Sequence, residues 1–268
     1  MDRLLIIKSF FKNLEIHSFT FILAFLTIIT GLFKYFLILF IIIILHELGH
    51  YLVACYYQWK VKKIILYPFG GLILFDEPLN KPLLEELFII LGGPFFQMLS
   101  YLVFFFFFKN NFLLLNTWNL YHNYHYTLLF FNLLPLYPLD GFKLFNIIGN
   151  YLVSFKKMHI ISLFISFFGL SLIFFKTLFS FNLSVFWVFL FLLTKSIIEF
   201  KNHSLIFNKF LLERFLYNFS FKKKYFIKSN NLEKMKRDKK HYFLIKEKYI
   251  AEKEILRKRF QFSENMIK

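Results

Sequence analysis

The chain has 268 residues, of which 58% are hydrophobic and 44 are Phe, and its 33 Lys or Arg against 16 Asp or Glu give a formal net charge of +17. The mean hydropathy is +0.55. A soluble domain of this length cannot bury so many apolar side chains, so the composition excludes an ordinary soluble enzyme and predicts a multi-span membrane protein. The single cysteine, Cys55, excludes an intrachain disulfide and a cysteine-based zinc site.

Apolar runs long enough to cross a hydrocarbon core of about 30 Å predict six membrane spans. They lie near residues 15–31, 33–57, 83–108, 122–140, 158–179 and 183–200. Lys and Arg gather before the first span, after the second, before the fifth and after the sixth. Because a positive excess marks the cytoplasmic side, this pattern predicts that both termini are cytoplasmic.

Residues 46–50 read His-Glu-Leu-Gly-His within the second predicted span. On a helix, His46 and His50 project from one face, and Glu47 lies almost one turn before His50. Each ionisable residue at the centre of a membrane helix costs roughly 2.5–3.5 kcal/mol, so such a cluster indicates a function. The spacing favours a metal ion on the two histidines, with Glu47 reaching a water bound to it. A hydrogen-bonded polar patch between packed helices is the alternative.

A catalytic zinc ion needs a further protein ligand. Asp140 ends a segment, residues 132–140, whose two prolines must break the fourth span. Unwound backbone at membrane depth is tolerated only where it is buried in protein or lines a cavity, so we favour Asp140 as the ligand over a plain turn. The other candidate carboxylates and imidazoles near the spans are Glu85, Glu86, Glu199, His122 and His125.

Residues 61–75 contain two β-prone runs around a glycine pair, the composition of a hairpin. We expect this hairpin to re-enter the membrane edge and to pair with an unwound substrate by strand addition; an amphipathic surface loop is the alternative. The residues predicted to bind substrate are Phe69, Gly70 and Gly71 in the hairpin, and Asn132 and Pro135 at the helix break. For Asn132, a cap on the broken helix is the alternative.

The two motifs, HELGH at residues 46–50 and NLLPLYPLDG at residues 132–141, together resemble the site-2 protease family of intramembrane zinc metalloproteases, and especially its sporulation branch. Shorter segments share the resemblance, namely Pro68-Phe69-Gly70-Gly71, Gly93-Pro94 and Phe210-Leu211-Leu212-Glu213-Arg214. The resemblance implies that one Zn²⁺ is bound by His46, His50 and Asp140, and that Glu47 is the general base.

The resemblance also implies the reaction and its setting. The expected activity is zinc-dependent hydrolysis of a peptide bond in a membrane-associated protein substrate, near the cytoplasmic face of the lipid bilayer. For the sporulation branch, this substrate is a sigma factor precursor, the enzyme lies in the membrane around the forespore with its site toward the mother cell, and small membrane proteins hold it inactive. Gln97 and Phe142 replace residues that are frequent in the family, and we expect neither to touch the metal ligands.

The composition changes after residue 200, because residues 201–268 carry 19 Lys or Arg and 7 Asp or Glu. Their pattern predicts a strand, helix, strand, helix unit, with these elements near residues 222–228, 232–238, 239–250 and 251–260. It resembles a shortened cystathionine-β-synthase-type module, which implies a nucleotide ligand, although no Gly-rich phosphate loop supports this. The charge favours anionic lipid or an acidic substrate, and we expect no nucleic acid partner.

The predicted fold is therefore an all-α polytopic membrane protein of about six transmembrane helices with a membrane re-entrant β-hairpin. The protease domain is expected in residues 1–200 and a small α+β cytoplasmic module in residues 201–268. A membrane metal or proton transporter should show a chain of ionisable residues and internal repeats, neither of which is evident in the sequence. A silent scaffold would tolerate loss of Glu47. A protease acting on a different membrane-anchored regulator is the alternative within the enzyme class.

Overall fold

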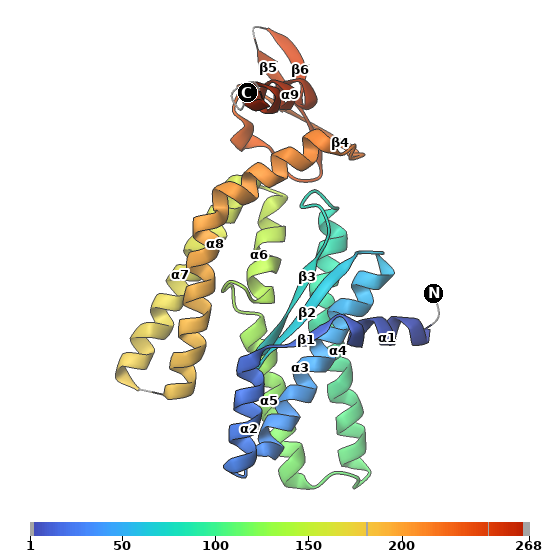
Figure 1. Ribbon diagram of the computed structural model, residues 1–268, viewed down its shortest axis with the longest axis vertical. Helices are drawn as coiled ribbons and strands as arrows, with labels where there is room; N and C mark the ends of the chain where they lie inside the picture. Colours follow the sequence, from blue (N-terminus) through green and yellow to red (C-terminus); the bar gives the residue numbers. More distant parts are fainter. Residues whose placement is uncertain (1–2, 181, 246, 265–268) are drawn as a thin grey trace. The chain divides into compact units, whose positions relative to one another are not determined.

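The computed structural model describes residues 3–180, 182–245 and 247–264, and its elements are labelled in Figure 1. The chain divides into two compact units. Unit 1 consists of Met1–Glu77, Leu87–Leu134 and Leu139–Gly141, and unit 2 consists of Pro78–Glu86, Pro135–Pro138 and Phe142–Lys268. The candidate metal site predicted from the sequence lies within unit 1.

The helices of unit 1 are arranged around α3 (Phe33–Tyr56). It contacts α1 (Arg3–Lys12), α2 (Ser18–Ile29) and α5 (Leu115–Asn132). The core on α3 is apolar and includes the buried side chains of Ile42, Ile43 and Tyr51. The remaining helix, α4 (Leu83–Lys109), crosses α3 where Gly92 meets Gly49: a Cβ atom on Gly49 would lie 2.4 Å from the Gly92 oxygen. Small residues permit such close approach of two helices.

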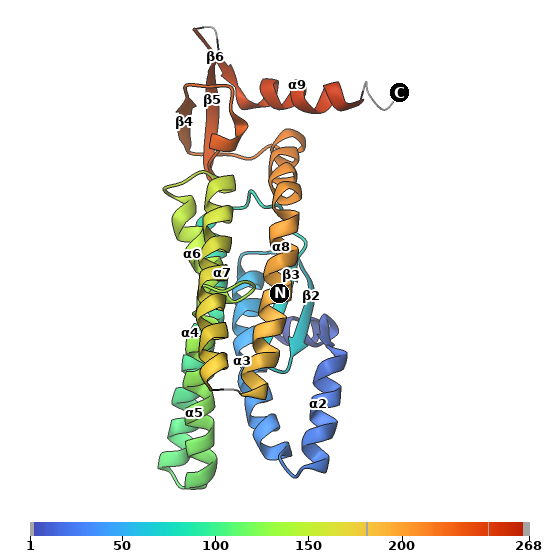
Figure 2. The ribbon, with the colours of Figure 1, turned by 90° about the vertical axis from the view of Figure 1, so that its left-hand side faces the viewer.

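A three-stranded sheet packs on α3, as Figure 2 also shows. Its strands are β1 (Leu14–Ile16), β2 (Val61–Tyr67) and β3 (Gly70–Phe75), in the order β1-β2-β3. β1 pairs with β2 in parallel, while β2 and β3 form the expected antiparallel hairpin. Its turn is Pro68-Phe69, because Tyr67 pairs with Gly70. One edge of β3 therefore pairs with no other strand among the described residues.

Unit 2 contains a long helical pair and a small α+β module. Helix α6 runs from Asp140 to Asn150, and α7 (Phe155–Phe179) packs beside α8 (Leu183–Leu216). The second sheet consists of β4 (Lys223–Ile227), β5 (Lys239–Ile245) and β6 (Lys248–Ala251), with α9 (Glu252–Glu264) against β5 and β6. The helix expected near residues 232–238 is wrong, because only a single 3₁₀ turn, Leu232–Lys234, forms before the backbone becomes extended at Met235.

Within the part of the chain that the structure describes, four helices are long and apolar enough to cross a membrane, namely α3, α4, α7 and α8. At most 39% of the apolar window of any of them is buried, and large side chains such as Leu102, Phe106 and Phe168 are at least 60% exposed. Surfaces of this kind are typical of lipid contact.

Two of the six predicted spans differ from the helices that form. The first contains only the 12 residues of α2, since residues 14–16 are extended in β1; the fourth ends at Asn132, before the loop 133–139.

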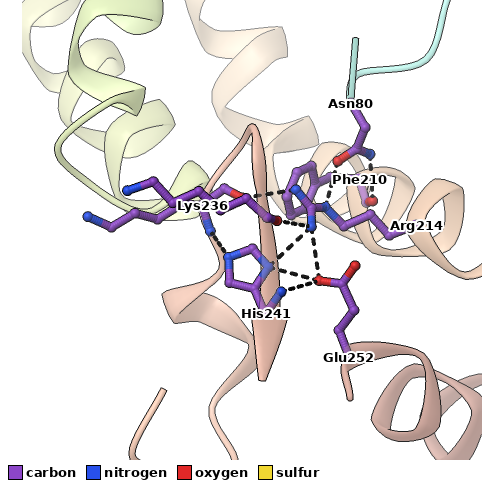
Figure 3. Close-up of polar contacts among 7 residues, drawn as sticks. Asn80, Phe210, Arg214, Lys236, His241 and Glu252 are labelled. Carbon is purple, nitrogen blue, oxygen red and sulfur yellow. Dashed lines mark hydrogen bonds and ion pairs between the residues drawn. The ribbon is translucent and has the colours of Figure 1, made fainter. Parts of the chain in front are cut away.

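Arg214, near the end of α8, is buried at the centre of a polar network in unit 2 (Figure 3). Its Nε donates to Asn80 Oδ1 at 2.7 Å, its Nη1 to Glu252 Oε2 at 3.0 Å and its Nη2 to the Lys236 carbonyl at 2.9 Å. His241 on β5 joins the network: its Nδ1 lies 2.9 Å from Glu252 Oε2, and its Nε2 accepts from the Lys236 N–H at 2.9 Å. The network thus joins α8 to the loop before α4 and to the C-terminal module.

The segment just before β5 also meets the start of α4 within unit 2. Asp238 Oδ2 accepts from the backbone N–H of Leu83, the first residue of α4, at 2.9 Å. Arg237 forms an ion pair with Glu86 in the first turn at 2.6 Å. A carboxylate at a helix N-terminus satisfies an N–H group that has no partner within the helix. The C-terminal segment therefore caps α4 from a distance of 155 positions along the chain.

Candidate metal centre

Helix α3 places His46, Glu47 and His50 in the interior of unit 1. Their exposed fractions are 1%, 4% and 6%. Because the two histidines are four residues apart, they project from one face of the helix. One ligand atom from each of the three side chains lies within 4.8 Å of the others. The sequence motif thus forms a compact buried cluster.

Asp140 joins this cluster from the first turn of α6. Its Oδ2 lies 3.0 Å from His46 Nε2 and 2.9 Å from His50 Nε2, and the two Nε2 atoms are 3.1 Å apart. Gly141 permits the tight loop before α6, since a Cβ atom there would lie 2.1 Å from the Leu133 oxygen. The structure therefore brings together the three residues that the sequence suggested as ligands.

The outer nitrogens of both imidazoles face acceptors. His50 Nδ1 lies 2.8 Å from the Ile89 carbonyl oxygen, and His46 Nδ1 lies 2.9 Å from Gln97 Oε1. A carbonyl oxygen only accepts, so Nδ1 of His50 carries a proton. The Gly93 N–H also lies 3.2 Å from His50 Nδ1, as a donor to the opposite tautomer would, but a metal bound at Nε2 would select the tautomer that donates to Ile89. The Nε2 atom of His50 then presents its lone pair toward Asp140.

This donor set fits a zinc ion. Three donor atoms converge at separations of 2.9–3.1 Å, which an intervening cation would stabilise. Donors about 2.0–2.1 Å from a tetrahedral zinc ion are separated by roughly 3.3 Å, close to these values. Gly93 leaves the adjacent space free, because a Cβ atom there would lie 2.3 Å from His50 Nε2. Two imidazoles and a carboxylate also form a catalytic zinc ligand set, which leaves a position for water.

The β2–β3 hairpin reaches Glu47 through Gly71. A Cβ atom on Gly71 would lie 2.3 Å from Glu47 Cδ, whereas a Cβ atom on Gly70 would meet nothing within 4 Å. Phe69, in the turn, stacks on Tyr67 with 6.3 Å between ring centroids. Gly71, one of the three hairpin residues predicted to bind substrate, thus packs against the cluster.

The two predicted residues at the helix break take different positions. Asn132 is the last residue of α5 and is buried, and its Nδ2 lies 3.4 Å from His46 Nε2. Its side chain therefore points toward the donors. Pro135 lies in the loop 133–139, which connects α5 to α6.

The sequence did not indicate that Gln97 and Gly93 lie against the proposed metal ligands. The expectation that Gln97 does not touch a metal ligand is wrong, because its Oε1 contacts His46. Gly93 lies against both histidines, since a Cβ atom built on it would lie 2.8 Å from His46 Nε2. The Gly93-Pro94 pair was a signal for this region, but no spacing rule connects Gln97 to a histidine 51 positions away.

Comparisons with known proteins place this geometry in a family. The profile of peptidase family M50 matches residues 34–114, which include His46, Glu47 and His50. Stage IV sporulation protein FB of Bacillus subtilis (strain 168) is 33% identical over 225 residues, covering 83% of this chain and 75% of that protein. The chain belongs to peptidase family M50. Membership makes it a membrane zinc metalloprotease, with zinc as its cofactor and a protein as its substrate.

Two further comparisons give matches in Methanocaldococcus jannaschii. A zinc metalloprotease of that organism is 34% identical over 147 residues, covering 50% of this chain and 42% of that protein. The solved structure of its site-2 protease superposes with a TM-score of 0.56 at 28% identity, covering 69% of this chain and 89% of the other. The fold is therefore that of a site-2 protease, and the chain is a multi-pass membrane protein.

Proposed function

We propose that this chain is an intramembrane endopeptidase whose zinc ion is held by His46, His50 and Asp140. The observation that carries the proposal is the convergence of their three donor atoms at separations of 2.9–3.1 Å. Glu47, buried in the same cluster, is the general base. This arrangement provides a metal, a position for water and a proton acceptor in one buried site.

The chain's own residues have distinct roles in the reaction. Zinc, when bound, supplies a Lewis acid that polarises the scissile carbonyl and lowers the pKa of its water to about 7. Glu47 accepts the proton of the attacking water and delivers it to the amine that leaves. Asn132 donates to the substrate backbone in this proposal, which its position 3.4 Å from His46 Nε2 supports.

The substrate must be extended before its peptide bond is accessible, because a helix hides its backbone. The open edge of β3, which pairs with no other strand among the described residues, supports binding by strand addition. Since Gly71 packs against Glu47, a strand added at this edge passes close to the proposed base. Phe69 and Gly70 extend the same surface, and Pro135 binds substrate from the loop that follows Asn132.

We also propose a membrane topology and a biological setting for this enzyme. Helices α2 and α5 complete six crossings, the hairpin re-enters the membrane, and both termini are cytoplasmic. Similarity to a protein named for stage IV of sporulation supports a role in sporulation. The proposed substrate is then a sigma factor precursor, in the membrane around the forespore, with small membrane proteins as regulators. Residues 1–200 form the protease domain, and the basic residues 201–268 form a cytoplasmic module.

The experiment is zinc analysis and cleavage of a membrane-associated sigma factor precursor by the purified chain. Glu47→Gln should keep zinc and lose cleavage, while Asp140→Ala should lose both. Cleavage by Glu47→Gln would contradict the role of Glu47. Full zinc content in Asp140→Ala would contradict the ligand assignment. Cleavage of another anchored protein, with the precursor intact, would reject only the sporulation substrate.

A further inference from the structure

Gln97 lies one turn beyond the Gly93-Pro94 pair on α4 and is fully buried, with an exposed fraction of 0%. Both ends of its amide are engaged. Its Oε1 lies 2.9 Å from His46 Nδ1, and its Nε2 donates to the His125 carbonyl oxygen at 2.8 Å. One side chain of α4 therefore connects a histidine on α3 to the backbone of α5.

The partner on α5 fixes which way the amide of Gln97 points. The His125 carbonyl oxygen can only accept, so the NH₂ group of Gln97 must face it and Oε1 must face His46. An oxygen at this position requires a proton on His46 Nδ1. The lone pair of His46 is consequently on Nε2, the atom 3.0 Å from Asp140 Oδ2.

We propose that Gln97 is the positioning residue of His46: it sets the tautomer and the ring plane of this zinc ligand, and thereby the zinc affinity. This inference rests on the proposed role of His46 as a ligand. Outer hydrogen-bond partners of zinc-bound histidines change metal affinity by about 10–100-fold when they are removed. In a membrane interior, water does not readily replace the lost acceptor.

A second hydrogen bond between the same two helices provides a matched control. Ser100, one turn after Gln97 on α4, is buried, and its hydroxyl lies 3.0 Å from the Tyr121 hydroxyl on α5. Loss of the Ser100 hydroxyl, which also donates to the Gln97 backbone carbonyl at 2.7 Å, removes a buried contact between α4 and α5 but leaves the Gln97 side chain and its contact with His46. It therefore separates support of the helix pair from support of the imidazole.

The test measures zinc affinity by chelator competition on the full chain in detergent, together with thermal unfolding of the metal-free protein. Gln97→Leu should weaken zinc binding by about 10–100-fold. Gln97→Glu, protonated in this buried site, can keep an oxygen on His46 and donate its O–H to the His125 carbonyl, so it should lose less zinc affinity than Gln97→Leu. Ser100→Ala should bind zinc like wild type, even where its unfolding temperature falls.

Three results would overturn the inference or its basis. Wild-type affinity in Gln97→Leu would show that Gln97 does not support the zinc ligand. Equal losses in Gln97→Glu and Gln97→Leu, with equal losses of thermal stability, would assign Gln97 to helix packing. Wild-type affinity in His46→Ala would instead reject the ligand assignment, and with it the proposed function.

Discussion

Gly71 lies directly against Glu47, with the position of a Cβ atom on this glycine only 2.3 Å from Glu47 Cδ. The hairpin and the helix that carries the zinc-binding motif are thus in contact at the carboxylate proposed as the base. Any side chain at position 71 must displace that carboxylate. The adjacent Gly70 has no such constraint, since nothing lies within 4 Å of its Cβ position.

Gly71→Ala should therefore lower the rate of cleavage by about 100-fold, the scale expected when a catalytic group moves by about 1 Å. Zinc content should remain that of wild type, because the three proposed ligands are not displaced. Gly70→Ala, whose added Cβ atom would meet nothing within 4 Å, is the comparison and should lower cleavage far less. Equal activity in the two variants would mean that the contact between Gly71 and Glu47 does not matter for catalysis.

Gly93→Ala should affect the metal itself. The added Cβ atom would lie 2.3 Å from His50 Nε2 and 2.8 Å from His46 Nε2. Metal sites tolerate distance errors of only about 0.2 Å, so zinc affinity should fall by at least about tenfold. Phe95→Ala, at a side chain on the same helix that is 65% exposed, should leave affinity unchanged. Unchanged zinc binding in Gly93→Ala would contradict the site geometry.

The Arg214–Glu252 pair should support the C-terminal module. Its Nη1–Oε2 distance is 3.0 Å, and its side chains are at most 8% exposed. Arg214→Met leaves Glu252 buried without its main cationic partner, which should destabilise the module by about 3–5 kcal/mol. Proteolysis of the full chain should then cut within residues 217–264. The double change with Glu252→Gln should cost less than the two single changes together, and full additivity would reject the coupling.

Acidification should also destabilise this module. Burial lowers the pKa of His241 from 6.5, and the charge of Arg214 adds to this effect while Glu252 opposes it. Burial alone would raise the pKa of Glu252, but hydrogen bonding from His241 and the charge of Arg214 lower it from 4.5. For both groups the unfolded state binds protons more readily, so stability rises with pH.

The expected stabilisation is therefore complete above pH 6.5 and decreases as the pH falls, first through His241 and then, below pH 4.5, through Glu252. Hydrogen exchange of β5 in the full chain, corrected for the intrinsic exchange rate, measures it. Protection that stays constant or increases between about pH 7 and about pH 5 would be inconsistent with this account.

The sequence motifs predicted most of the candidate site because membrane burial makes polar residues informative. His46, His50 and Asp140 are costly in lipid unless they have a function, and the structure places their donor atoms together. Gln97 carries no charge and shows no spacing relative to His46. Its role becomes visible only when the crossing of α3, α4 and α5 is known.

The fold was predictable where local pattern decides the structure. Long apolar runs predicted α3, α4, α7 and α8, and β-prone runs predicted the β2–β3 hairpin. Long-range contacts decided the rest. Pairing of β1 with β2 keeps residues 14–16 extended, and partners in α8 and β5 determine the path of the chain near residue 236. Neither set of contacts can be predicted from the sequence of residues 14–16 or of the residues around 236.

An anomalous difference map at the zinc edge, from crystals of the zinc-loaded protein, would locate the metal relative to the three proposed ligands. We predict one peak about 2.0–2.2 Å from His46 Nε2, His50 Nε2 and an Asp140 carboxylate oxygen. The ligand assignment would be contradicted by a zinc peak away from these three atoms, or by zinc bound to the histidines without Asp140.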